Sequence, residues 1–289
     1  MAHQLIEVFL SGITIAAVYA VAAIGLSLLY GVSEVFNYGY GSLLMLMAYF
    51  AWLLFAKFSW INYGLVFLIL IPIAFLIGLI IDGAIARPLR RRENWQITTI
   101  LATLGLGMMI DGFILLFFGP YGKSLPELWG KEINIGGYTI AGSRLAMLLI
   151  SVCVVIVVER FLCKSRYGMN MRAVSQDMVG ARIVGLHINR VFGYTFGLST
   201  ALAGVSGVLL TSVYMLSPEG GWAFFIKGFV VVALGGVGSL RGALYAALIL
   251  GVAESFVQWG VGPVWVMPFW LIILIAVLSV RPRGLLGIR

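Results

Sequence analysis

The chain has 289 residues, of which 62% are hydrophobic and only 10% are charged. Soluble domains carry about 25% charged residues, so this composition excludes a water-soluble fold and indicates a surface that faces lipid. The formal net charge of +8 is typical of a membrane protein with a basic cytoplasmic face, and we expect no nucleic-acid partner.

Long apolar runs follow one another along the whole chain. A transmembrane helix needs about 20 apolar residues, whereas barrel strands would appear as short alternating segments. The pattern predicts an all-α polytopic membrane protein, a single domain over 1–289 with about 8–10 transmembrane or half-membrane helices. The runs are 5–30, 42–57, 62–86, 96–118, 143–163, 190–215, 223–237, 242–260 and 264–281.

Basic residues gather in three places, at 87–92, 160–190 and 281–289. The positive-inside rule places all three on the cytoplasmic side. The loop 119–144 balances its lysines with glutamates and is expected outside, where 131–140 predicts a small hairpin about Gly136-Gly137. We expect the N-terminus to be cytoplasmic.

Two glycine-rich segments, 30–42 and 234–242, interrupt the apolar pattern. Irregular backbone at membrane depth is tolerated where it is buried in protein or lines a cavity, and paired interruptions indicate a transporter's substrate path. The alternative is a pair of cytoplasmic turns with helix-packing glycines, which the spacing of Gly238 and Gly242 also fits.

Two carboxylates lie within apolar runs, Asp111 and Glu254. Such groups usually face the interior of a bundle, where they line a polar path or satisfy backbone donors. Asp82 lies near the arginines of 87–92, and we expect it to pair with one of them.

The segment 172–186 has small and apolar residues at helical spacing, which predicts one short amphipathic helix ended by Gly185. Its small face, Gly180-Ala181, suits docking against another protein. An interfacial helix is the alternative, but the segment has no Trp or Phe anchor.

Three blocks, in order, resemble the LivH-type permeases of branched-chain amino-acid ABC importers. They are 25–45, the Arg172–Leu186 segment, and Leu234-Gly-Gly-Val-Gly-Ser-Leu-Arg-Gly-Ala243 with Gly251-Val-Ala-Glu254; the closing 281–287 is similar as well. The resemblance covers nearly the whole chain and implies a type II ABC importer-like permease bundle with an internal pseudo-repeat, in a bacterial inner membrane.

The resemblance also implies partners: a second related permease, two cytoplasmic ABC ATPases and a periplasmic substrate-binding protein. This chain would bind no cofactor or metal, and ATP-Mg would be held by the ATPases, which dock on the 172–186 segment. The residues expected to couple to the ATPases are Arg172, Ala173, Asp177, Gly180, Ala181 and Gly185.

The first block departs from the family pattern Asn-Phe-Ala-His-Gly-Glu. Tyr40 stands in place of the His and Ser42 in place of the Glu. The expected solutes are therefore branched-chain or related amino acids, urea or short amides. The expected substrate path comprises Asn37, Gly39, Tyr40, Gly41, Ser42, Asp111, Gly235, Gly236, Gly238, Ser239 and Glu254.

The chain is not expected to be an enzyme. Gly122-Lys123-Ser124 resembles the end of a P-loop, but Phe117 stands where the first Gly is required. A passive channel, a gradient-driven carrier and an integral-membrane enzyme remain as rivals. The docking segment disfavours the channel, the paucity of clustered carboxylates disfavours the carrier, and the absence of a metal or nucleophile cluster disfavours the enzyme.

Overall fold

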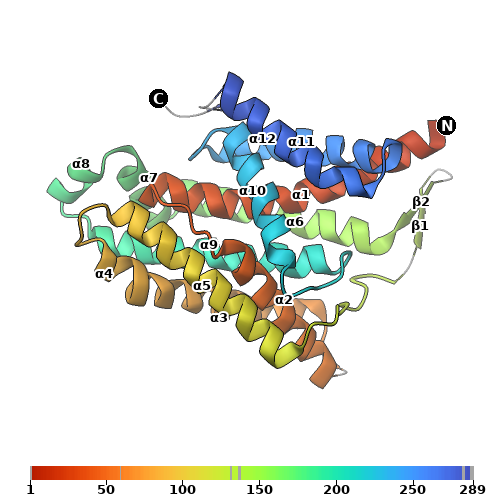
Figure 1. Cartoon of the computed structure of the whole chain (residues 1–289), viewed down its shortest axis with the longest axis horizontal. Coiled ribbons are helices and arrows are strands. Elements are labelled where there is room, and N and C mark those ends of the chain that lie inside the picture. Colours follow the sequence, from red (N-terminus) through yellow and green to blue (C-terminus); the bar gives the residue numbers. More distant parts are fainter. Residues whose placement is uncertain (1, 59, 131, 136–137, 282–283, 287–289) are drawn as a thin grey trace.

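The computed structural model describes residues 2–58, 60–130, 132–135, 138–281 and 284–286. Most helices lie roughly along the long axis of the molecule (Figure 1). Eight helical segments of the described residues are long and apolar enough to cross a membrane, and the shorter Gly220–Gly235 adds a ninth apolar helix. The nine apolar runs of the sequence therefore correspond to helices, because length and apolarity dominate helix formation in lipid. The helices are α1 Ala2–Ser33, α2 Tyr40–Lys57, α3 Tyr63–Ile81, α4 Arg87–Leu89, α5 Trp95–Phe118, α6 Gly142–Lys164, α7 Arg166–Gln176, α8 Met178–Ile183, α9 Ile188–Thr211, α10 Gly220–Gly235, α11 Leu240–Gly260 and α12 Val266–Val280.

Two helices, α1 and α9, form the interior of the bundle and are mostly buried, whereas α3, α5, α6 and α12 expose most of their surface. Small residues permit this close packing. A Cβ on Gly251 of α11 would lie 2.6 Å from the Cα of Ala16 in α1, and one on Gly207 of α9 would lie 2.3 Å from the Leu44 carbonyl oxygen. Small residues let backbones approach in this way where lipid supplies no hydrophobic drive for helix association. The outer helices carry the large exposed apolar side chains that face lipid or a partner.

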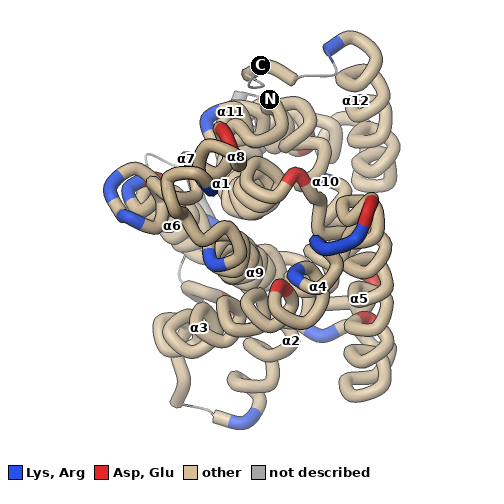
Figure 2. Tube along the Cα trace, turned by 90° about the vertical axis from the view of Figure 1, so that its left-hand side faces the viewer, with Lys and Arg blue, Asp and Glu red and all other residues tan. Residues whose placement is uncertain are grey.

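The arginine-rich connections meet at one end of the bundle, here called the basic end. It holds α4, α7 and α8, at the left of Figure 1, and Figure 2 looks onto it. The opposite end holds strands β1 Glu132–Ile135 and β2 Tyr138–Ala141. These strands pair antiparallel with Ile135 opposite Tyr138, so the predicted strands are confirmed, while the Gly136-Gly137 turn lies outside the described residues.

We expected the N-terminus to be cytoplasmic, on the same side as the basic end. This expectation is wrong, because α1 starts at the opposite end of the bundle. The first turns of α1 lie beside the hairpin end, where Arg144 at the start of α6 donates to the Ser11 hydroxyl at 2.9 Å. The last turns of α1 lie at the basic end beside α7, where Gly31, Met171 and Arg172 line one pocket. The first helix therefore crosses the whole bundle before the chain turns back at residues 34–39.

The segment 172–186 is two helices rather than the single one expected. Asp177 has an extended backbone and ends α7, and its Oδ1 accepts from the backbone N–H groups of Val179 and Gly180 at 2.9 Å. A side chain that caps a new helix competes with continuation of the preceding one. The predicted end at Gly185 is confirmed: Gly185 has φ +87°, and the N–H of Leu186 donates to the Ala181 carbonyl, as in a Schellman cap.

Candidate substrate path and docking segment

The first glycine-rich interruption forms a break inside the bundle. After α1, residues 34–39 leave the helical conformation, and α2 begins at Tyr40. The amide oxygen of Asn37 accepts from the Gly39 N–H at 3.0 Å, and the Tyr38 N–H donates to the Thr103 hydroxyl of α5 at 3.2 Å. Asn37 and Thr103 are both buried, so the two side chains hold an irregular backbone whose donors would otherwise be unpaired.

Glycines bring three helices together at this break. A Cβ on Gly41 would lie 2.2 Å from the Gly221 carbonyl oxygen of α10, and one on Gly107 of α5 would lie 3.1 Å from the Gly39 Cα. A larger side chain at Gly41 would have to push the two backbones apart. The start of α2 is thus clamped between α5 and α10.

Asp111 of α5 faces this clamp. Its carboxylate lies beside Ser42 and Trp222 and within electrostatic reach of Glu219. Ser42 and Trp222 interact favourably with this carboxylate, but its buried Oδ1 has no well-formed hydrogen bond to any described residue. A buried, unpaired carboxylate oxygen is energetically costly and calls for an explanation by function.

Aromatic rings border the same region. The ring of Tyr38 lies 5.2 Å from that of Phe225 in α10, and Trp222 lies 5.9 Å from Phe225 at a right angle. These contacts combine apolar walls with a few polar groups, which is the usual lining of a site for a small organic solute. Neither Trp222, Phe225 nor Thr103 was singled out in the sequence, because their position opposite residues 37–42 depends on the packing of α5 and α10.

Tyr40 belongs to the predicted path but points elsewhere. Its side chain is buried, and its hydroxyl donates to the Ala22 carbonyl of α1 at 2.9 Å. That hydrogen bond satisfies the hydroxyl within the core. Of the first block, Gly39 lies against Gly107 of α5 and Ser42 lies beside Asp111, whereas the phenol of Tyr40 packs toward α1.

The second glycine-rich interruption is a tight turn at the basic end, between α10 and α11. Gly236 and Gly238 have φ of +99° and +82°, and the Ser239 hydroxyl caps α11 by accepting from the Gly242 N–H at 3.1 Å. The tail after α12 covers it, with Leu286 N–H donating to the Gly235 carbonyl at 3.0 Å. Gly238 contacts Gly31 at the end of α1, but this turn is not brought together with Asp111.

Glu254 lies in a separate, fully paired cluster. Its Oε1 accepts from Lys227 Nζ of α10 at 2.6 Å and its Oε2 from Trp270 Nε1 of α12 at 3.1 Å. Lys227 also donates to the Tyr19 hydroxyl of α1 at 2.8 Å. Lys227 was missed in the sequence because it lies in the apolar run 223–237; a lone lysine at such a depth is itself a signal for a buried acidic partner.

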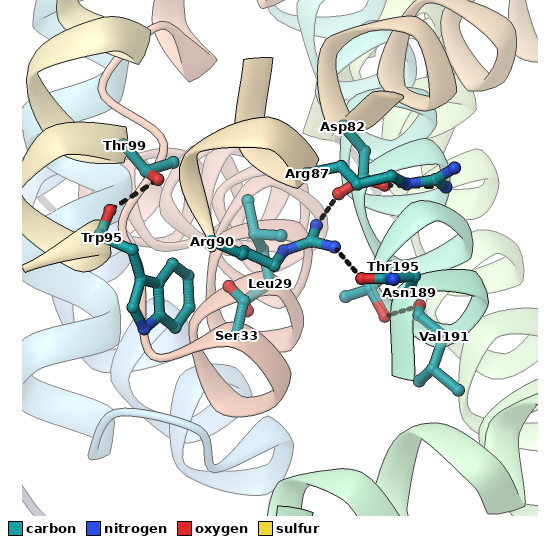
Figure 3. A network of polar contacts seen from close by, with 10 residues as sticks. All are labelled: Leu29, Ser33, Asp82, Arg87, Arg90, Trp95, Thr99, Asn189, Val191 and Thr195. Carbon is teal, nitrogen blue, oxygen red and sulfur yellow. Dashed lines mark hydrogen bonds and ion pairs between the residues drawn. The ribbon is translucent and has the colours of Figure 1, made fainter. Parts of the chain in front are cut away.

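A polar network at the basic end joins α3 to α9 (Figure 3). Asp82, which begins a π-helical turn Asp82–Ala86, is buried and pairs with Arg90 and, at 3.5 Å, with Arg87, so the expected pairing is confirmed. Arg90 also donates to the Asn189 side chain at 3.0 Å in the first turn of α9 and covers the Phe192 ring at 4.3 Å. Burial lowers the pKa of Arg90 to about 10, so the guanidinium remains positively charged at neutral pH.

The expected docking residues have mixed placements. Ala181 is only 5% exposed, so it faces the bundle and not a partner, in contrast to the outward small face that the spacing suggested. The exposed side of α8 and its C-cap residue is instead largely apolar: Val179, Ile183 and Val184 are exposed by 70%, 80% and 76%, beside the exposed Arg182. Arg172 donates to the Cys163 carbonyl at 3.2 Å, while Ala173 and Gly180 are half-buried.

These features define a multi-pass membrane transport protein: eight candidate spans, an irregular polar break inside the bundle, and short exposed helices at a basic end. The chain belongs to the family described as branched-chain amino acid transport system / permease component, whose family model matches residues 8–278. That family is a transport component, in keeping with a subunit that is not an enzyme.

Among relatives, the high-affinity branched-chain amino acid transport system permease protein LivH of Salmonella typhimurium is 28% identical over 290 residues, covering 96% of this chain and 94% of LivH. The permease protein LivM of Escherichia coli K12 is 27% identical over 276 residues, covering 85% of this chain and 62% of LivM. Among solved structures, PsaBC from Streptococcus pneumoniae in complex with Fab shares the fold at a TM-score of 0.51 and 12% identity, over 98% of this chain and 97% of that one. The fold is thus shared with PsaBC, and the permease family is shown by the sequence match.

Proposed function

We propose that the chain is one membrane-spanning permease subunit of an ATP-driven importer for branched-chain or closely related amino acids in a bacterial inner membrane. The family match over residues 8–278 carries this proposal. Similarity to both LivH and LivM supports a second, related permease as partner. Two cytoplasmic ABC ATPases that hold ATP-Mg and an external binding protein complete the proposed assembly.

The substrate path runs past Asp111 in this proposal. The unpaired Oδ1 accepts a hydrogen bond from the ammonium group of a passing amino acid, and Ser42 supplies a second polar contact. The apolar side chain of the solute packs against Tyr38, Trp222 and Phe225, whose rings lie close together. Weak binding suffices because a separate binding protein sets the affinity of the importer.

ATP-driven motion enters through α7 and α8. The positive-inside rule makes the basic end cytoplasmic, and the exposed apolar face of α8 suits a groove on the ATPase. Motion of α8 passes directly to α9 through the short connection 184–187. Since α9 packs against α2 at Gly207, the start of α2 beside Asp111 responds to the movement, and access alternates between the two sides.

Co-purification of the ATPase from native membranes in mild detergent tests the proposal. Ile183→Glu places a charge on the exposed face of α8, where the wild-type side chain is 80% exposed, and is expected to release the ATPase without unfolding the permease. Tyr121→Glu is the matched control, because Tyr121 is 82% exposed and lies in the loop after α5, away from the basic end. An ATPase that associates with neither wild type nor control contradicts the importer assignment.

A further inference from the structure

A cavity of about 590 Å³ opens at the basic end between the α4–α5 connection and the start of α9. Five arginines line it and, among the described residues, no Asp or Glu does; the arginines are Arg87, Arg90, Arg91, Arg182 and Arg190. Its volume is within the usual range for small-molecule sites. The substrate path past Asp111 does not use any of these residues.

The positive charge of this cavity is mostly uncompensated. Asp82 pairs with Arg87 and Arg90, which leaves Arg91, Arg182 and Arg190 without an ion pair to any described residue. These three side chains belong to exposed residues and can reach a ligand from outside. Like charges crowded around one cavity repel one another, and a bound anion relieves that repulsion.

The walls of the cavity also offer hydrogen-bond donors in a fixed arrangement. Arg90 is held by Asp82 and Asn189, its side chain is 11% exposed, and its buried Nε has no partner among the described residues. The His187 side chain does not cap α9, and the Arg190 N–H donates to the His187 carbonyl at 2.9 Å, so only the N–H groups of Ile188 and Asn189 at the start of that 24-residue helix are left for a ligand beside the arginines. Guanidinium groups match the geometry of phosphate oxygens particularly well.

The depth of the cavity favours phosphate over other anions. The candidate spans Tyr63–Leu89, Trp95–Phe118 and Ile188–Thr211 end or begin at its wall, and Trp95 lines it. Tryptophan at the end of a span marks the level of the lipid headgroups. Basic pockets between membrane helices on the cytoplasmic side suit phosphate-bearing headgroups.

From the charge, the donors and the depth, we infer that this cavity binds a phosphate-bearing anion, which bridges the α4–α5 connection to α8 and α9. The phosphate comes from an anionic phospholipid headgroup or from a free phosphate compound. In either case the anion ties the helices proposed to receive the ATPase to the rest of the bundle. This inference concerns the isolated chain and does not depend on the proposed importer function.

Thermal unfolding of the delipidated full chain in neutral detergent, at constant ionic strength, tests the inference. One arm adds phosphatidylglycerol against phosphatidylcholine, and the other adds inorganic pyrophosphate. A ligand that binds only the folded state raises the unfolding midpoint with concentration. A rise with phosphatidylglycerol alone identifies the headgroup as the source, and a rise with pyrophosphate identifies a free phosphate compound; both support a phosphate site.

Charge-matched variants locate the binding. The triple variant Arg91→Gln, Arg182→Gln, Arg190→Gln leaves the Asp82 ion pairs intact and is expected to weaken the response on the order of tenfold or more. The control triple Arg160→Gln, Lys164→Gln, Arg166→Gln removes the same charge from exposed residues outside the cavity and is expected to respond like wild type. If the first triple fails to fold, Arg182→Gln alone is compared with Arg160→Gln, with retained phospholipid counted by native mass spectrometry.

Two results would overturn the inference. One is a wild-type chain whose unfolding midpoint responds to neither probe. If the cavity triple then still impairs ATPase association, the cavity receives an acidic protein surface and not a phosphate. The other is equal loss of response in both triples, which indicates general surface charge.

Discussion

The two carboxylates within the membrane spans, Glu254 and Asp111, have opposite environments. Glu254 is 2% exposed, and both its oxygens accept hydrogen bonds, from Lys227 and Trp270. Asp111 is half-buried and has one buried oxygen without a partner among the described residues. The two carboxylates lie at similar positions in apolar runs, and only their contacts distinguish them. Glu254 joins α11 to α10 and α12, whereas Asp111 has an oxygen that, in the proposed function, accepts a hydrogen bond from the solute.

The largest expected effect on stability comes from breaking the Glu254 cluster. Glu254→Ala leaves Lys227 buried and unpaired, which costs about 3–5 kcal/mol of the free energy of unfolding. The double variant Lys227→Met, Glu254→Leu removes both charges and is expected to recover most of that loss. Unfolding in mixed detergent and dodecyl sulfate measures the stability of both variants. A double variant as unstable as Glu254→Ala would show that the loss does not come from an unpaired Lys227.

The next effect concerns the clamp that positions α2 opposite Asp111. Gly41→Ala places a methyl group 2.2 Å from the Gly221 carbonyl oxygen, and overpacking of this kind costs about 1–3 kcal/mol. The matched control is Gly112→Ala, since a Cβ there has nothing within 4 Å. The same unfolding measurement and solute uptake by the full assembly should both fall in Gly41→Ala and stay unchanged in the control.

A smaller effect is expected in the second glycine-rich segment. Gly238 has φ +82°, and an added Cβ would meet only the Gly31 Cα at 3.4 Å, so Gly238→Ala is limited to the backbone strain of about 1–2 kcal/mol. Because this turn lies apart from Asp111, the variant should lower stability but keep the solute preference. A changed preference would place the turn in the path and remove the distinction between the two segments.

Much of the fold was predictable from the sequence, because crossing a bilayer demands long apolar helices whose runs are visible directly. The ion pair of Asp82 was also predictable, since Arg87 and Arg90 lie within about two turns of it along the chain. The direction of α1 was not predictable. The sequence leaves open whether the chain has crossed the whole membrane or only part of it when it reaches residues 34–39. Glu34 lies at that break with a φ of +55°, but a glutamate is not a residue type that predicts a left-handed backbone.

The candidate site was predictable only in part. The first block and Asp111 do lie on the same side of the bundle, with Gly39 against Gly107 of α5 and Ser42 beside Asp111, because polar and glycine residues in an apolar run have few other uses. The pairing of Glu254 with Lys227, 27 residues away, and the inward orientation of Ala181 depend on tertiary packing. The Asp177 break could have been read from the sequence, since Asp is a preferred N-cap residue.

The smallest effect on stability, and the most direct test of the account, comes from Asp111→Asn. The change removes a charge that has no ion pair among the described residues, so unfolding should shift by only about 0.5 kcal/mol or less. The measurement is ATP-dependent uptake of labelled leucine into proteoliposomes that contain this chain, its partner permease and their ATPases, with binding protein outside. The account predicts that Asp111→Asn assembles normally and loses most uptake, whereas wild-type uptake by the variant would contradict a substrate path past Asp111.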